Sequence, residues 1–176
     1  SYWVAISGNG VVTGGAGGGA MELISTTVVS TAVASVDFTS IPSTYKELVL
    51  IINGETTATS ASGYIRGSQD NGLTWLSSQY VLYRASGAGT TEAITASGAS
   101  ANGVQILRST IDGLQERDAE VKILGYSDTG RTAKVIGNSI GNLSTGEVSF
   151  ERFNGTVENT LPIDAVQYYG GTINIT

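Results

Sequence analysis

The acidic residues that could do chemistry are concentrated in one short segment. Four of them form the densest group in the chain: Asp112, Glu116, Asp118 and Glu120. Two carboxylates held about 5 to 9.5 Å apart can act as acid and base in the hydrolysis of a glycosidic bond. Sequence spacing does not determine that distance, and Arg117 and Lys122 interrupt the group. The pattern therefore favours a solvated, charged segment over the catalytic pair of a small glycosidase.

The chain contains neither histidine nor cysteine. This absence excludes histidine general bases, cysteine nucleophiles, Ser-His-Asp triads and zinc sites built on these residues. It also excludes disulfides, so cysteine pairing says nothing about the redox compartment. Any catalysis would then depend on paired carboxylates; we expect a protein that is not an enzyme and that carries no cofactor.

A polar stretch, Gln69-Asp70-Asn71-Gly72, offers oxygen atoms that Ca²⁺ could use as ligands. It lacks the regularly spaced acidic positions and the terminal glutamate of a dedicated calcium loop. Asn-Gly is also a strong turn signal. We interpret the stretch as a turn, with a calcium site near Asp70 as the alternative.

Aromatic residues gather in one part of the sequence. The four of interest are Tyr64, Trp75, Tyr80 and Tyr83. Aromatic rings on a β-sheet can stack against sugar rings, so these four are candidate contacts for a host glycan or a protein partner. Packing in a core or an interface explains them equally well. In the pair Tyr168-Tyr169 the two rings point to opposite faces of a strand, so at least one should enter the core.

The size and charge of the chain limit its partners. A length of 176 residues fits one domain with an extension. The formal net charge is −6, and the nine Lys and Arg residues do not cluster. Proteins that bind nucleic acids usually display a basic patch, so no nucleic-acid partner is expected. No apolar run approaches the ~20 residues of a membrane helix, so no membrane insertion is expected.

The elements that must position these residues are short β-strands separated by turns. Five Asn-Gly pairs and one Asp-Gly pair supply the turns. Expected strands are 2–6, 21–29, 36–39, 48–52, 64–66, 80–83, 104–107, 121–124, 133–136, 148–150, 165–169 and 173–175. The continuous apolar run 48–52 is typical of a strand buried on both faces. Polar stretches at 84–102 and 125–132 should be loops, and only 112–119 could form a turn or two of helix. The pattern predicts an all-β fold, an antiparallel sandwich or barrel of about ten strands.

The first 20 residues differ from the rest. A short apolar head, residues 2–6, is followed by a segment rich in glycine, which cannot form a core of its own. We predict an extended assembly arm at 1–20, supported by a neighbouring subunit, and a sandwich domain at 21–176. A floppy tail is the alternative. The expected arm contacts are Tyr2, Trp3, Val4, Ile6, Val11 and Val12.

Part of the sandwich domain has a familiar sequence. The segment from Leu23-Ile24-Ser25 to Leu48-Val49-Leu50 contains Ser40-Ile41-Pro42 followed by Thr44-Tyr45. It resembles the opening of a recurrent class of tailed-bacteriophage structural proteins, in which such a corner precedes an apolar strand. The closing segment 169–175 resembles the final strand of that class. The chain departs from the class at Arg66–Gly72, where relatives carry an Asn-Gly-Asp loop, and it lacks the Leu-Tyr-Gly ending.

The corner motif has a physical meaning of its own. Val36 and Phe38 alternate with polar residues and should fill one face of a strand. Pro42 should turn the corner, because proline cannot donate to a β-ladder. Tyr45 should cap the edge of the core, and 48–52 should be a central strand.

The resemblance implies a jelly-roll sandwich in a virion and supplies no catalytic residues. We expect a tail or fibre component on the exterior of the tail or capsid, made in the cytoplasm of the bacterial host. The alternatives are a capsid decoration protein, of the cement or head-fibre kind, and a module that binds a host surface glycan. The expected partners are other virion structural proteins and further copies of the chain, with a trimer favoured for a fibre.

Overall fold

A computed structural model describes the backbone of residues 2–7, 22–56, 62–76, 80–88, 91–100, 102–107, 116–142 and 148–170. Side chains are described in the same ranges except at 2–7, 54–56, 80–88, 91–100 and 116.

The described chain forms β-strands and no helix, which confirms the predicted all-β class. The twelve strands are β1 (Tyr2–Ser7), β2 (Glu22–Val28), β3 (Ser35–Phe38), β4 (Glu47–Thr56), β5 (Gly63–Ser68), β6 (Tyr80–Ala88), β7 (Thr91–Ser100), β8 (Val104–Leu107), β9 (Glu116–Leu124), β10 (Ala133–Asn142), β11 (Val148–Val157) and β12 (Ala165–Tyr169).

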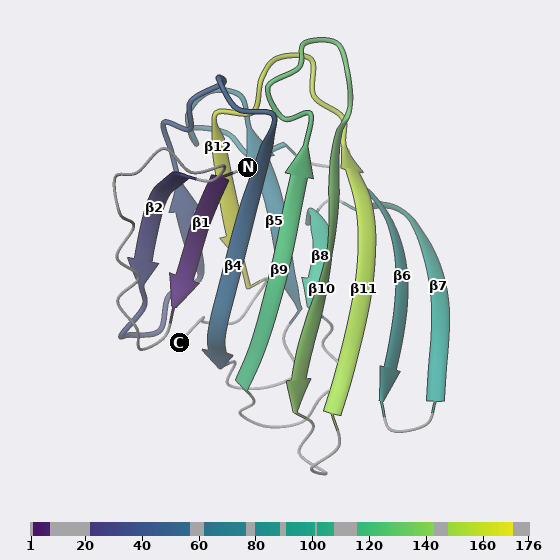
Figure 1. Cartoon of the computed structure of the whole chain (residues 1–176). Helices are drawn as coiled ribbons and strands as arrows, with labels where there is room; N and C mark the ends of the chain where they lie inside the picture. Colours follow the sequence, from purple (N-terminus) through teal and green to yellow (C-terminus); the bar gives the residue numbers. More distant parts are fainter. Residues whose placement is uncertain are drawn as a thin grey trace.

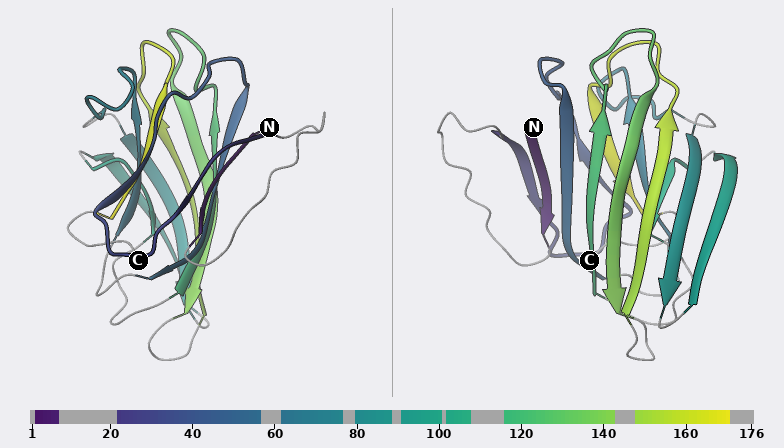
Figure 2. Two further views of the ribbon diagram at one scale, coloured as in Figure 1. Left: turned by 90° about the vertical axis from the view of Figure 1, so that its left-hand side faces the viewer. Right: turned by 45° about the vertical axis from the view of Figure 1, so that its right-hand side comes forward.

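The strands form two sheets (Figure 1). The larger has eight strands in the order β2-β1-β4-β9-β10-β11-β6-β7, and the smaller has four in the order β3-β12-β5-β8. Within the described chain, β1 is parallel to both of its neighbours, and every other pair is antiparallel. Figure 1 shows β12, β5 and β8 of the small sheet behind β4, β9 and β10 of the large one, and the side view in Figure 2 separates the two layers.

One hydrophobic core lies between the sheets. Leu48, Leu50 and Ile52 of β4 point into it from the large sheet, and Val36 and Phe38 of β3 point into it from the small sheet. The alternation of apolar and polar residues in β3 therefore has the predicted effect, because successive side chains of a strand point to opposite faces. Val49, on the outer face of β4, is also buried, which confirms that this strand is covered on both faces there.

The corner after β3 behaves as the motif predicts. The strand ends at Phe38, Ile41 is buried, and the backbone N–H of Ile41 donates to the carbonyl of Asp164. Tyr45 is half-buried and packs against the core. The corner thus joins β3 in the small sheet to β4 in the large one.

Two sequence predictions are wrong. The expected loop at 84–102 is largely the hairpin β6–β7, and the expected helical turn at 112–119 is β9 from Glu116 onward. The hairpin is built from small residues that carry little apolar periodicity, and pairing with β11 along nine residues gives it its conformation. The predicted loop 125–132 is confirmed as the β9–β10 connection. Residues 108–115 and the expected strand 173–175 lie outside the described residues.

The N-terminal strand lies inside the large sheet of its own chain. β1 runs between β2 and β4 and pairs with six residues of each. Its register sets Tyr2, Val4 and Ile6 beside the β4 residues whose side chains fill the core. Trp3 also lies in this strand, whereas Val11 and Val12 fall outside the described residues. In this structure β1 pairs within its own chain, and the expected support by a neighbouring subunit stays a prediction.

Candidate functional site

The outer face of the small sheet carries a cluster of aromatic and polar side chains. We call it the tyrosine–arginine face and define it by Tyr64 and Arg66 of β5, Gln105 of β8, and Gln167 and Tyr169 of β12. Cross-strand register sets Tyr64 beside Tyr169 and Arg66 beside Gln167. It also sets Tyr64 beside Gln105. The core-facing residues between them, such as Ile65 and Tyr168, are buried.

Arg66 holds the centre of this face. Its guanidinium carbon lies 4.0 Å from the centroid of the Tyr169 ring, a cation–π contact. Its Nε donates to the carbonyl oxygen of Asn102 at 2.8 Å. The rings of Tyr64 and Tyr169 lie 6.2 Å apart at an angle of 35°. Two contacts therefore hold the guanidinium in one place above a pair of neighbouring rings.

Gln167 and Asp37 complete the face on the side of β3. The amide nitrogen of Gln167 donates to Oδ1 of Asp37 at 2.9 Å. Gln167 is only 6% exposed, and its Oε1 has no hydrogen-bond partner. A buried acceptor without a donor is uncommon in folded proteins, because it has lost its bonds to water without replacement. This face therefore contains one unused acceptor beside Arg66.

The structure separates the four aromatic residues that the sequence grouped together. Tyr64 is on the tyrosine–arginine face, whereas Trp75 follows the turn after β5, within reach of Gly72. Tyr80 and Tyr83 belong to β6 of the large sheet, opposite Val157 and Asn154 of β11. The backbone therefore places these four residues on different elements, and their contact with a glycan or partner stays a prediction.

Sequence reasoning missed the actual neighbour of Tyr64. That neighbour is Tyr169, 105 positions away in the sequence, and only strand pairing brings the two together. The available signal was the pair Tyr168-Tyr169. Tyr168 is wholly buried, as expected for at least one of the two, and Tyr169 is therefore turned outward.

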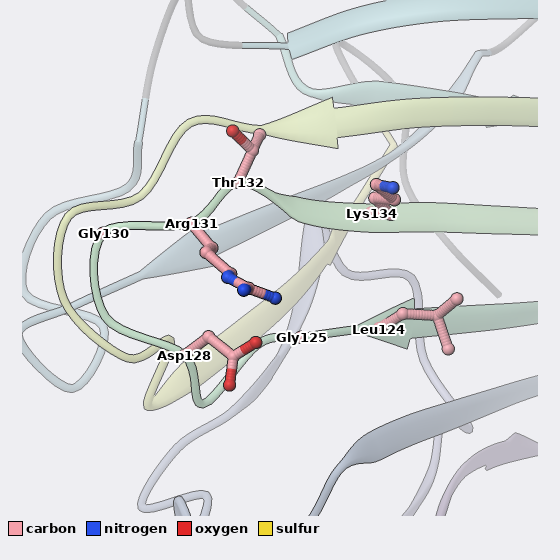
Figure 3. Close-up of a pocket in the computed structure, with 7 residues that line it drawn as sticks. All are labelled: Leu124, Gly125, Asp128, Gly130, Arg131, Thr132 and Lys134. Carbon is pink, nitrogen blue, oxygen red and sulfur yellow. The ribbon is translucent and has the colours of Figure 1, made fainter.

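A pocket of about 540 Å³ lies at the β9–β10 connection (Figure 3). Its lining consists of Leu124, Gly125, Asp128, Gly130, Arg131, Thr132 and Lys134. The side chains of Asp128 and Arg131 extend toward the same region of the loop (Figure 3). Positive φ angles at Gly125 and Gly130 allow the connection to turn twice. One carboxylate and two cations at an exposed loop can attract a small ion, but they lack a nucleophile with an adjacent base.

The acidic segment is only partly described. Asp118 and Glu120 lie on the outer face of β9, two residues apart, which spaces them by about 7 Å. They line a shallow depression of about 230 Å³ together with Ile51, Asn138 and Ile140. Glu120 forms an ion pair of 3.5 Å with Lys122, and both side chains are more than 40% exposed. The described acidic residues thus form a solvated, charged surface, as the sequence predicted. Asp112 lies outside the described residues, and so does the side chain of Glu116.

The stretch around Asp70 is a turn, and the Asp70 carboxylate accepts hydrogen bonds from residues of the same turn. Oδ1 of Asp70 accepts from the Ser68 hydroxyl at 2.7 Å and from the Thr74 N–H at 2.8 Å. Oδ2 accepts from the Thr74 hydroxyl at 2.5 Å. These bonds from Thr74 and Ser68 lower the pKa of Asp70 from 3.8 to about 2. No three acidic residues within the described ranges lie close enough together to hold a metal ion.

The described segments contain no helix of the length and apolar character needed to cross a membrane. Comparisons of the chain with protein-family models, with curated proteins and with solved structures found no match.

Proposed function

We propose that the chain is a non-enzymatic structural protein of a tailed-bacteriophage virion, a tail or fibre component built on a jelly roll. Support comes first from the resemblance of residues 23–50 to the opening of that class of proteins. The apolar residues of the motif, Val36, Phe38 and Ile41, are buried. A capsid decoration protein is the second candidate, since the same arguments apply to it.

The strand order supports a jelly roll. A jelly roll pairs its eight strands, B to I, as the sheets B-I-D-G and C-H-E-F, from two Greek keys. The small sheet, β3-β12-β5-β8, matches B-I-D-G in both order and sequence position. In the large sheet β4, β6 and β7 match C, E and F, and the meander β9-β10-β11 stands where H would be. β1 and β2 then extend the sheet beyond C.

The observation that carries the assembly role is the placement of β1 between β2 and β4. Removing β1 would leave the facing edges of β2 and β4 unpaired over six residues each. An incoming strand can satisfy both edges through its backbone, as in strand-addition complexes. The 14 residues between Ser7 and Glu22 could span about 46 Å when extended. A neighbouring copy could therefore supply the same strand in the same register.

The outer face of the large sheet offers a second support for assembly. Ile140 lies opposite Phe150 on the neighbouring strand, and these side chains are 52% and 38% exposed. Val148 is also 52% exposed and lies two residues from Phe150 on β11. Large apolar side chains that gather on a solvated face are typical of contact surfaces.

Cysteine cross-linking can test whether β1 is exchanged between copies of the chain. The chain has no cysteine of its own, so introduced cysteines are the only thiols. Ala5 and Ile51 are register partners on β1 and β4. Two single variants, Ala5→Cys and Ile51→Cys, are refolded together and oxidised. Exchange predicts a covalent heterodimer on a non-reducing gel. A third sample carries both substitutions in one chain. If only this double variant forms a disulfide, within its own chain, and the mixed single variants form none, β1 is not exchanged.

A matched control uses partners that both lie on central strands. Lys134→Cys and Thr156→Cys are opposite one another on β10 and β11, at the far end of these strands from Ile140 and Phe150. This pair should cross-link only within a chain. Light scattering after size exclusion, with and without residues 1–20, then gives the assembly state. A trimer would support the role of a fibre component. A monomer in both forms would instead favour a protein that decorates a preformed capsid.

A further inference from the structure

We propose that the tyrosine–arginine face binds a carbohydrate that carries a carboxylate or phosphate group. Arg66 would hold the anionic group, and the ring of Tyr64 would pack against the sugar. This inference goes beyond the assembly role and does not depend on it. A folded chain of any oligomeric state can be tested for it.

The charge of Arg66 is available to a ligand. Its Nε is occupied by the Asn102 carbonyl, and no described carboxylate forms an ion pair with it. Asp37, the nearest acidic residue in register, accepts instead from Gln167. The two terminal amino groups of the guanidinium therefore keep their donors, in the planar fork that matches carboxylate and phosphate oxygens.

The position of Arg66 is prepared before any ligand arrives. The Tyr169 ring supports the guanidinium from one side, and Asn102 holds it from another. Gly103, with φ of +113°, permits the approach of Asn102, since a Cβ there would lie 2.5 Å from the Ile65 carbonyl oxygen and 3.0 Å from Cγ of Arg66. A side chain already held in place loses little freedom on binding, which favours affinity.

The rest of the face suits a sugar rather than an isolated anion. The half-buried Tyr64 ring lies beside the Arg66–Tyr169 pair and combines an apolar surface with a hydroxyl. Carbohydrates supply the C–H faces that pack against such a ring, and hydroxyl groups that can accept from an arginine. All these groups stand on β5 and β12, the two inner strands of the small sheet, which are more rigid than loops.

Titration with three probes tests the proposal. The probes are sialyllactose, which carries a carboxylate, glucose 1-phosphate, which carries a phosphate, and neutral lactose. Saturation-transfer NMR and calorimetry on the full chain should detect sialyllactose or glucose 1-phosphate, with lactose at least about tenfold weaker. Whichever charged probe binds more tightly identifies the source of the anion. Equal binding of lactose, or no binding of either charged probe at millimolar concentration, would overturn the proposal.

Variants assign the binding to this face. Arg66→Gln should weaken the charged probe by about tenfold or more, and Arg66→Lys should recover only part of the loss because the fork is missing. Tyr64→Phe keeps the ring and should bind within about threefold of the parent, whereas Tyr64→Ala should not.

Arg152→Gln removes an exposed arginine from the other sheet and is the matched control. If it weakens binding as much as Arg66→Gln, the interaction is with overall charge and the site is not here. Thermal unfolding of every variant separates loss of binding from loss of folding. Loss of binding only in variants that have unfolded would also count against the site.

Discussion

The hydroxyl of Tyr126 donates a hydrogen bond of 2.5 Å to the carbonyl oxygen of Pro42, 84 positions earlier in the chain. Tyr126 is wholly buried, and its own carbonyl accepts from the N–H of Ile163. One side chain thus joins the β9–β10 connection to the corner after β3, and its backbone joins it to the segment before β12. Three connections meet over one end of the core at this residue.

Tyr126→Phe removes that hydroxyl and leaves the packing of the ring intact. We expect the free energy of unfolding to fall by about 1 kcal/mol, the usual net value of such a bond. Urea denaturation measures it. Tyr45→Phe is the control, because its hydroxyl meets Glu22 at 3.3 Å on an exposed surface. An equal loss in both variants would show that the Pro42 bond has no special weight.

Asp70→Asn should change how stability depends on pH. The pKa of Asp70 is lowered to about 2 in the folded chain, below its ordinary value of 3.8, by bonds from Thr74 and Ser68. Ionised Asp70 therefore stabilises the fold above about pH 4, and this contribution disappears as the pH falls toward 2. The melting temperatures of parent and variant should differ most at neutral pH and converge near pH 2. A difference that is constant across this range would contradict the assignment.

Gly137→Ala should disrupt the centre of the large sheet. A Cβ at this position would lie 2.1 Å from the Glu120 carbonyl oxygen and 2.7 Å from the Phe153 ring. Backbone on the next strand cannot move aside without breaking its ladder, so we expect a loss of about 3 kcal/mol. Gly67→Ala is the control, since its Cβ would meet only the flexible side chain of Ile163 at 3.1 Å. Denaturant melts should rank the two variants in that order.

The pair Ile140→Ser and Phe150→Ser tests the proposed contact surface. Both side chains are exposed, so the unfolding free energy of the isolated chain should change by no more than about 0.5 kcal/mol. Self-association, measured by sedimentation equilibrium in an analytical ultracentrifuge, should weaken if this face meets another copy. Lys134→Ser and Asn154→Ser, exposed on the same two strands, are the control. An unchanged association constant in the apolar pair would remove this face from the assembly.

Sequence patterns predicted the individual strands well where at least one face is buried. Val36 and Phe38 alternate with polar residues, and the run 48–52 is continuously apolar, so burial alone selects a strand in both cases. The hairpin β6–β7 was missed because its many Ala, Ser, Gly and Thr residues show no strong period. Its conformation comes from pairing with β11, a partner about 70 positions away.

The candidate site could be predicted only in part. Tyr64 was identified from its type, but Arg66 and Gln167 carried no sequence signal that distinguished them from other polar residues. Their roles depend on register, since a shift of one residue between β5 and β12 would turn Arg66 away from Gln167 and Tyr169 away from Tyr64.

By itself, the sequence determined the all-β class, the absence of histidine and cysteine chemistry, the turn at Asp70 and the corner at Pro42. These are local properties, decided by residue type, spacing and short-range hydrogen bonds. The tertiary structure decided which strands are neighbours, the place of β1 between β2 and β4, and the meeting of Arg66 with Tyr169. Such pairings bring together residues from distant parts of the chain, and they are selected by the burial of one common core rather than by any local preference.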